Sequence, residues 1–149
     1  MKIVTLNELK GTEREVVSPA GWTSNRFLLK ADGMGFSMHE TVFPANLEVR
    51  MWYKHHVEAV YCIAGSGLLT NLESSEEHPI EPGTFYALDG HERHILKART
   101  EMHFICVFNP PVTGRETHDD DGSYAFPDDV DEGDPAAPKN QPETKDNGR

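Results

Sequence analysis

Short apolar segments separated by Gly, Pro and Asn fill the chain up to Phe126, and helical periodicity is nearly absent. Segments of this length and composition are typical of β-strands. The candidate strands are Lys2–Leu6, Arg26–Leu29, Gly35–Phe43, Ala59–Ala64, Gly67–Leu72, Thr84–Leu88, His94–Ala98 and His103–Phe108. Only Leu6–Lys10 can form a helical turn, and glycine turns at Ala64–Gly67 and Glu81–Gly83 separate consecutive strands. The pattern predicts an all-β fold with little helix, either a sandwich or a closed barrel.

The chain of 149 residues has the length of one domain. From Pro127 onward it reads PDDVDEGDPAAPKNQPETKDNGR, with proline and acidic residues throughout and no aromatic side chain. Such a stretch cannot bury enough apolar surface to offset the entropy lost when it becomes ordered. We therefore predict one folded domain over residues 1–126 and a disordered, acidic, proline-rich tail over residues 127–149.

Charge and hydropathy exclude two classes of partner. The net charge is −11, and no basic stripe is present that could neutralise the phosphates of a nucleic acid. No stretch of 18 apolar residues exists, and the N-terminus lacks the apolar core of a signal peptide. Cys62 and Cys106 each lie inside an apolar segment, which favours buried, reduced thiols. We expect a cytoplasmic protein that binds neither nucleic acid nor membrane.

Two stretches carry candidate metal ligands. In HHVEAVYCIAGSG (55–67), Glu58 opens a strand and Gly65 follows after six residues; in PGTFYALDGHERH (82–94), a tight turn precedes His94. Together they resemble the paired signature of the cupin superfamily, E-x6-G and then G-x5-P-x-G-x2-H. Because barrel strands project alternate side chains inward, Glu58 and His94 can converge on one cation. The same alternation lets Tyr86 point into that cavity.

The sequence departs from the common cupin pattern in its histidines. The stretch Val49–Tyr53, where most metal cupins have His-x-His, contains no histidine, and the P-x-G turn is replaced by Asp89–His91. Either no metal binds, or another side chain completes the site. A phenolate oxygen from Tyr86, beside Glu58 and His94, would suit a hard or borderline cation such as Fe²⁺.

Longer stretches are more specific. The runs YKHHVEAVYCIAGSG (53–67), LDGHERH (88–94), CVFNPPVTGRETHDDDGSY (106–124), GWTSNRFLL (21–29) and MGFSMHET (34–41) are similar to the ectoine synthase family. This resemblance implies a single cupin barrel, small and jelly-roll-like, in a cytoplasmic homodimer. The enzymes of this family, which are carbon–oxygen hydro-lyases, close N-γ-acetyl-L-2,4-diaminobutyrate into ectoine with loss of water. They serve compatible-solute biosynthesis under osmotic stress.

The resemblance also implies a ligand set and a substrate site. Iron would be bound by Glu58, Tyr86 and His94. The family's substrate pocket matches Trp22, Arg26, Thr41, Tyr53, Cys106, Phe108, Glu116 and His118, and His39 and His56 lie beside matched positions.

The substrate's α-amine must attack a poorly electrophilic amide carbonyl, which a metal ion can polarise. Arg26 can clamp the substrate carboxylate, while Trp22 and Phe108 can exclude water. Glu116 is the candidate general base, and Tyr53 or His118 can orient the substrate or deliver the proton. We further expect the run that follows the last strand to close over bound substrate.

Two other functions remain open at this point. One is another metal-dependent small-molecule cupin enzyme, such as a dioxygenase or an isomerase. An oxygenase usually requires two or three histidines around its iron, and they are missing at the usual positions. The other is a non-catalytic, ligand-binding cupin, against which the polar run Gly114–His118 argues.

Overall fold

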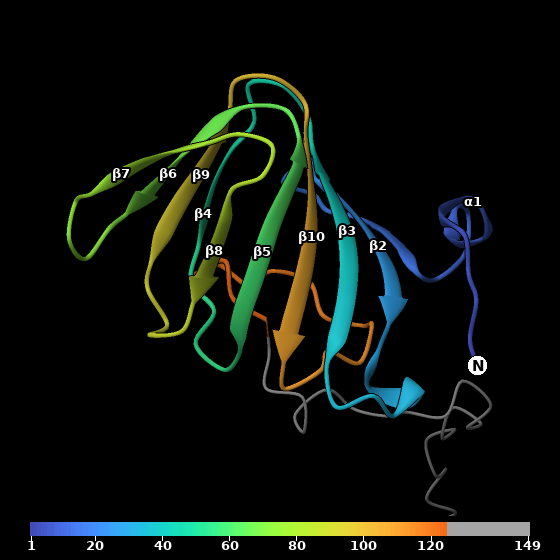
Figure 1. Cartoon of the computed structure of the whole chain (residues 1–149). Coiled ribbons are helices and arrows are strands. Elements are labelled where there is room, and N and C mark those ends of the chain that lie inside the picture. Colours follow the sequence, from blue (N-terminus) through green and yellow to red (C-terminus); the bar gives the residue numbers. More distant parts are fainter. Residues whose placement is uncertain (125–149) are drawn as a thin grey trace, which may run out of the picture.

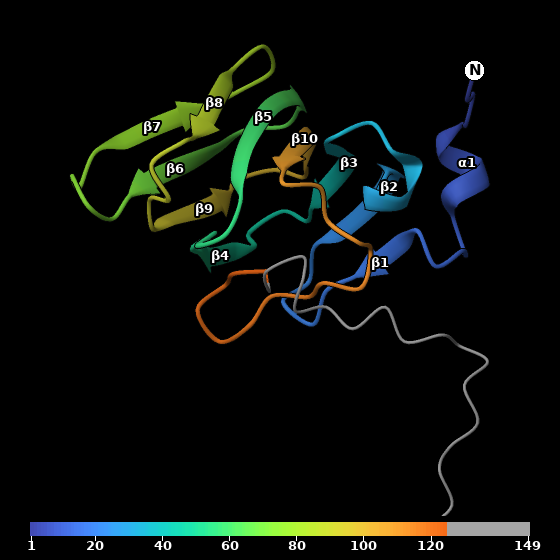
Figure 2. The same cartoon turned by 90° about the horizontal axis from the view of Figure 1, so that it is seen from below.

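Two antiparallel β-sheets face each other across the core (Figures 1 and 2). The computed structural model describes residues 1–124; the predicted boundary at residue 126 and the predicted tail over residues 127–149 lie outside this range. One sheet has the order β1 (Glu15–Val17), β2 (Thr23–Leu28), β3 (Ser37–Phe43), β10 (Met102–Asn109), β5 (Val57–Ala64) and β8 (Phe85–Leu88). The other has the order β4 (Glu48–Met51), β9 (His94–Ala98), β6 (Gly67–Asn71) and β7 (Glu77–Ile80). The predicted all-β barrel is confirmed.

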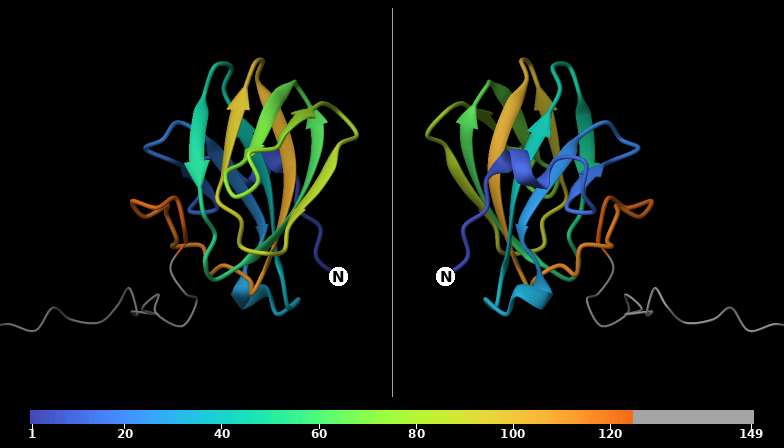
Figure 3. Two further views of the ribbon diagram at one scale, coloured as in Figure 1. Left: turned by 90° about the vertical axis from the view of Figure 1, so that its left-hand side faces the viewer. Right: turned by 90° about the vertical axis from the view of Figure 1, so that its right-hand side faces the viewer.

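Strand alternation builds the core between the sheets. Along β10, Met102, Phe104, Cys106 and Phe108 are buried, and the residues between them are half-buried on the outer face. The neighbouring strand β5 buries every second residue from Glu58 onward in the same way. The Glu58 carboxyl group therefore lies on the inner, apolar face of the barrel, which Figure 3 shows from two opposite sides.

The first residues of the chain correct one prediction. Lys2–Leu6 forms no strand; instead the short helix α1 (Leu6–Leu9) occupies the place of the predicted helical turn. The Glu8 carboxylate accepts hydrogen bonds from the Thr5 amide at 2.6 Å and the Thr5 hydroxyl at 2.7 Å. These capping hydrogen bonds favour the helical turn over a strand. No helix within residues 1–124 is long and apolar enough to cross a membrane.

Three strands were not predicted from the sequence: β1, β4 and β7. All three are short and lie at sheet edges, where few apolar residues are needed. Pro79 is tolerated inside β7, because an edge strand pairs on one side only and does not need every backbone N–H as a hydrogen-bond donor.

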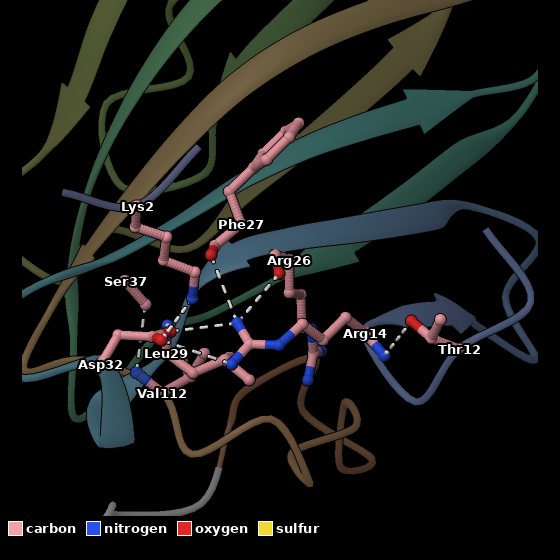
Figure 4. Close-up of polar contacts among 9 residues, drawn as sticks. All are labelled: Lys2, Thr12, Arg14, Arg26, Phe27, Leu29, Asp32, Ser37 and Val112. Atoms are coloured by element: carbon pink, nitrogen blue, oxygen red, sulfur yellow. Dashed lines mark hydrogen bonds and ion pairs between the residues drawn. The ribbon is translucent and has the colours of Figure 1, made fainter. Parts of the chain in front are cut away.

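A polar network fixes the N-terminal segment to the end of β2, close to the turn η1 (Lys30–Asp32) (Figure 4). The Asp32 carboxylate accepts hydrogen bonds from the Leu29 amide at 2.8 Å and from Arg14 at 3.0 Å, and it pairs with Lys2. Burial alone would raise the pKa of Asp32, but the Lys2 and Arg14 contacts lower it. Arg14 also donates to the carbonyl of Phe27 at 3.2 Å. The strand that carries Arg26 is thereby held at its outer end.

Gly65, just after β5, provides a test of the fold. Its φ is +84°, and an added Cβ would lie 2.0 Å from the Glu101 carbonyl oxygen. We expect Gly65→Ala to cost at least about 2 kcal/mol more unfolding free energy than Gly83→Ala, measured by urea denaturation. Gly83 has φ +94° but nothing within 4 Å of an added Cβ, so its variant isolates the backbone strain. Equal losses in the two variants would refute the close approach.

Candidate active site

A cavity opens between the two sheets. Six of the predicted substrate residues line it: Trp22, Thr41, Tyr53, Cys106, Phe108 and His118. Two of the predicted metal ligands, Glu58 and Tyr86, line it as well. The wall is completed by Phe43, Met51, Val60, Leu96, Phe104 and Tyr124. Strand residues far apart in sequence thus meet residues from the C-terminal run.

Glu58 and Tyr86 come from paired strands. In the β5–β8 register, Glu58 is opposite Leu88 and Val60 is opposite Tyr86, so both polar side chains share the inner face. Phe85 and Ala87 are exposed on the outer face, as alternation predicts. Tyr86 also lines a neighbouring cavity, in which it meets His94, the first residue of β9. Tyr86 thus shares one cavity with Glu58 and another with His94, whereas Glu58 and His94 share neither.

The chemistry of these three residues fits a cation. Burial raises the pKa of Glu58 to about 8, and its hydrogen-bond partner, the Cys106 thiol, only partly offsets this. No lysine or arginine contributes to the shift, so the carboxylate lacks a compensating positive charge. Burial and the adjacent Glu58 likewise raise the pKa of Tyr86. A divalent cation would hold both oxygens in the anionic, ligating form.

His94 is oriented as a metal ligand would be. Its Nδ1 lies 3.0 Å from the Glu92 carbonyl oxygen, which can only accept, so Nδ1 carries the proton and the Nε2 lone pair is free. Burial lowers its pKa and favours this neutral form. Among residues 1–124, no three His, Cys, Asp or Glu side chains form a group that could hold a metal ion. The three-residue ligand set that includes the Tyr86 oxygen stays a prediction.

Tyr53 and His118 form a hydrogen-bonded pair in the cavity wall, with 2.9 Å between the phenol oxygen and Nε2. Burial lowers the pKa of His118 to about 4 and raises that of Tyr53, so both are uncharged near neutral pH. The His118 ring lies 4.9 Å from the Trp22 ring, and the Tyr53 ring lies 6.2 Å from the His94 ring. The pair lies between Trp22 and the candidate metal ligand His94. There it can accept one proton and donate another.

Arg26, His39 and His56 lie behind the cavity wall. Arg26 is 0% exposed, and its Nη2 donates to the Glu116 carbonyl at 3.0 Å, whereas Nε and Nη1 have no partner. The rings of His39 and His56 pack against Phe108 at 5.3 and 6.0 Å. One nitrogen of His39 and both of His56 are also unpartnered. Buried polar atoms of this kind are costly unless a ligand or water satisfies them.

The Glu116 carboxylate has a different environment. It accepts hydrogen bonds from the amides of Thr113 at 2.7 Å and Gly114 at 2.9 Å, and it is buried outside the cavity lining. In this arrangement it stabilises the turn that precedes His118. Its role as general base stays a prediction.

Tyr124 is the residue that sequence reasoning missed most clearly. It is buried and lines the cavity, with ring centroids 5.0 Å from His118, 5.2 Å from Tyr53 and 5.5 Å from Phe108. Its presence in the same run as Glu116 and His118 was the available signal. The apolar wall residues, by contrast, cannot be told from ordinary core residues in the sequence.

His118 makes stability depend on pH. Since its pKa falls from 6.5 to about 4 on folding, the unfolded chain binds more protons between these values, and stability falls as pH decreases through that window. In metal-free protein, His118→Gln should lose about 1–2 kcal/mol less unfolding free energy between pH 7 and pH 5 than the parent. Urea denaturation at both pH values measures this. The same loss in both proteins would show that His118 titrates normally when folded.

Known proteins of one family are similar to this chain over most of its length. The chain matches the family described as ectoine synthase over residues 1–128. It is 57% identical over 133 residues to an L-ectoine synthase of Alkalilimnicola ehrlichii, covering 89% of this chain and 100% of that protein. An L-ectoine synthase of Halalkalibacterium halodurans is 50% identical over 129 residues, which cover 87% of this chain and 99% of the relative.

Solved structures agree. The crystal structure of ectoine synthase from P. lautus superposes with a TM-score of 0.76 at 49% identity, covering 82% of this chain and 87% of the other. A polyketide cyclase from Streptomyces resistomycificus has a TM-score of 0.61 at 19% identity and covers 74% of this chain and 80% of that one. At that identity the second match shows a shared fold only.

Proposed function

The chain belongs to the ectoine synthase family, and on this premise we propose how its barrel closes N-γ-acetyl-L-2,4-diaminobutyrate into ectoine. In this reaction the α-nitrogen bonds to the acetyl carbon, the carbon–oxygen bond breaks and water leaves. The observation that carries the proposal is the meeting of Glu58, Tyr86, Tyr53 and His118 at one cavity, in a chain 57% identical to a curated L-ectoine synthase.

Substrate binding uses a buried cation and aromatic side chains of the cavity wall. The unpartnered nitrogens of Arg26 supply a buried positive charge for the substrate carboxylate, and paired contacts from one guanidinium fix its direction. The rings of Trp22 and Phe108 exclude water from the folded substrate, which favours ring closure over hydrolysis. Holding amine and carbonyl within reach of each other contributes several kcal/mol, by order of magnitude.

Glu58, Tyr86 and His94 would hold a divalent cation, which we propose to be Fe²⁺. Bound there, it would supply Lewis acidity to the amide carbonyl oxygen. The cavity-facing positions of Glu58 and Tyr86 support this placement, as does the free Nε2 of His94.

Proton transfer is supported best at the Tyr53–His118 pair. Neutral His118 has a lone pair on one ring nitrogen, which can accept the proton that the α-nitrogen loses after the free amine has bonded to the acetyl carbon. Its pKa of about 4 makes the protonated ring a strong acid, which returns the proton readily to the departing oxygen. Tyr53 keeps its proton and orients the imidazole. Glu116, the base predicted from the sequence, then supports His118 by stabilising the preceding turn.

We propose a cytoplasmic homodimer. Buried free thiols at Cys62 and Cys106 agree with a reducing compartment. Large apolar side chains are exposed on the outer face of β5 and β8, namely Val57, Tyr61, Ile63 and Phe85. Such a surface favours contact with a second copy. Sedimentation should give twice the chain mass, and fractionation should place the protein with cytoplasmic markers; a monomer or a membrane-bound fraction would contradict these statements.

The function itself is tested by product formation. Purified protein is incubated with N-γ-acetyl-L-2,4-diaminobutyrate and Fe²⁺ under exclusion of oxygen, and proton NMR follows the acetyl methyl signal. We expect the methyl signal of the cyclic amidine to replace that of the acetamide. Absence of product from folded protein with bound metal would contradict the proposed ectoine synthase activity.

A further inference from the structure

Tyr124 completes the cavity from the C-terminal side of the chain. Its side chain is 3% exposed, and its ring contacts Tyr53, Phe108 and His118, all of which line the same cavity. Burial raises the pKa of its phenol, so the side chain stays neutral. Tyr124 thus offers the cavity an aromatic face without a charge.

The guanidinium of Arg26 is oriented by the same C-terminal run. Its Cζ lies 5.9 Å from the centroid of the Tyr124 ring, and its Nη2 donates to the carbonyl of Glu116. Arg14 contacts Arg26 only at the backbone: its guanidinium donates to the Arg26 carbonyl at 3.4 Å, and its own carbonyl accepts from the Arg26 amide at 2.8 Å (Figure 4). Because Nε and Nη1 are buried and unpartnered, the aromatic face of Tyr124 is a main determinant of where these donors point.

The run that carries Tyr124 is fastened to the end of β4. The Trp52 amide donates to the Gly122 carbonyl at 3.2 Å, and the Lys54 amide donates to the Ser123 hydroxyl at 3.1 Å. An added Cβ on Gly122 would lie 2.4 Å from the Arg50 carbonyl oxygen, so the two backbones pack directly. The position of Tyr124 is therefore fixed by contacts of the neighbouring backbone.

We propose that Tyr124 is a positioning residue that holds the Arg26 guanidinium toward the α-carboxylate of the substrate and so sets the preference for a carboxylated substrate. The proposal rests on the proposed function, in which Arg26 binds that carboxylate. A planar guanidinium discriminates a carboxylate only when its donors are held in direction, because a freely rotating head binds less selectively. The ring of Tyr124 faces the guanidinium, and its phenol oxygen also accepts a hydrogen bond from the Arg26 side chain, which lowers the phenol pKa against the effect of burial.

The test compares two ligands that differ only in the carboxylate. One is N-γ-acetyl-L-2,4-diaminobutyrate, characterised by its KM; the other is N-acetyl-1,3-diaminopropane, characterised by its competitive inhibition constant. We expect Tyr124→Leu to reduce the preference for the carboxylated ligand about tenfold, as expected for loss of a buried cation–π contact. Tyr124→Phe keeps the ring but removes the hydroxyl that accepts from Arg26, so it should reduce the preference less than Tyr124→Leu does.

A matched control separates positioning from general loosening. Phe43 also lines the cavity but packs against Phe104 at 6.0 Å, so Phe43→Leu should weaken both ligands equally. In an Arg26→Met background, Tyr124→Leu should have no further effect on the preference. Equal weakening of both ligands by Tyr124→Leu, or an unchanged preference, would overturn the proposal. If the parent protein forms no ectoine, the proposed function fails instead, so the two failures are distinguishable.

Discussion

Replacing Glu58 by alanine is expected to abolish metal binding and to lower turnover by at least about a thousandfold. Glu58 supplies the carboxylate of the candidate ligand set, and Tyr86 with His94 cannot hold a hard cation firmly without it. The variant should remain folded, because the lost carboxyl is buried without a positive partner and its removal relieves a desolvation cost. Metal content by mass spectrometry and product formation by NMR measure the two losses.

A second buried glutamate provides the control. Glu40 lies on the other face of the same sheet, where it accepts hydrogen bonds from Asn25 at 2.7 Å and contacts His103 at 2.9 Å. Glu40→Gln should therefore keep metal and turnover. If Glu58→Ala retained turnover, the metal would play no part at this position, even in a functioning ectoine synthase.

Replacing Arg26 by methionine is expected to raise the KM for substrate about a hundredfold while making the ligand-free protein more stable by about 1–2 kcal/mol. The guanidinium is 0% exposed with two unpartnered nitrogens, so the folded protein bears an uncompensated cost that an apolar side chain of similar length removes. A substitution that raises stability but weakens substrate binding indicates that the original residue serves binding and not folding. Steady-state kinetics and urea denaturation measure the two effects.

Arg14 is the matched control for Arg26. Its guanidinium is fully engaged, with hydrogen bonds to Phe27 and Asp32, so Arg14→Met should lower stability and change the KM by less than about threefold. Loss of stability in Arg26→Met together with an unchanged KM would mean that Arg26 has a structural role.

The sequence predicted the fold class and most of the barrel strands because apolar alternation and glycine turns are local signals. It failed at Lys2–Leu6, where capping by Glu8 favours a helix, and at the edge strands β1, β4 and β7, which are only three or four residues long. Pairing partners at an edge are set by tertiary contacts, which no local pattern reveals.

The candidate site was predictable to the extent that strand alternation determines it. The inward direction of Glu58 and Tyr86 follows from the period of two along β5 and β8, and the structure agrees. Tyr124 was not found, because it lies in a run without regular structure whose position depends on backbone packing at Gly122. Likewise, the sequence gives no sign that the Glu116 carboxylate accepts two amides of its own turn.

The central claim is that one divalent cation, held by Glu58, Tyr86 and His94, enables the cyclisation. The most direct measurement adds Fe²⁺ stepwise to metal-free protein and records the rate of ectoine formation at each step. We expect no turnover without metal, a linear rise in rate up to one equivalent of Fe²⁺ per chain, and a plateau beyond it. Full turnover in the presence of a chelator, with no metal bound to the protein, would contradict this claim.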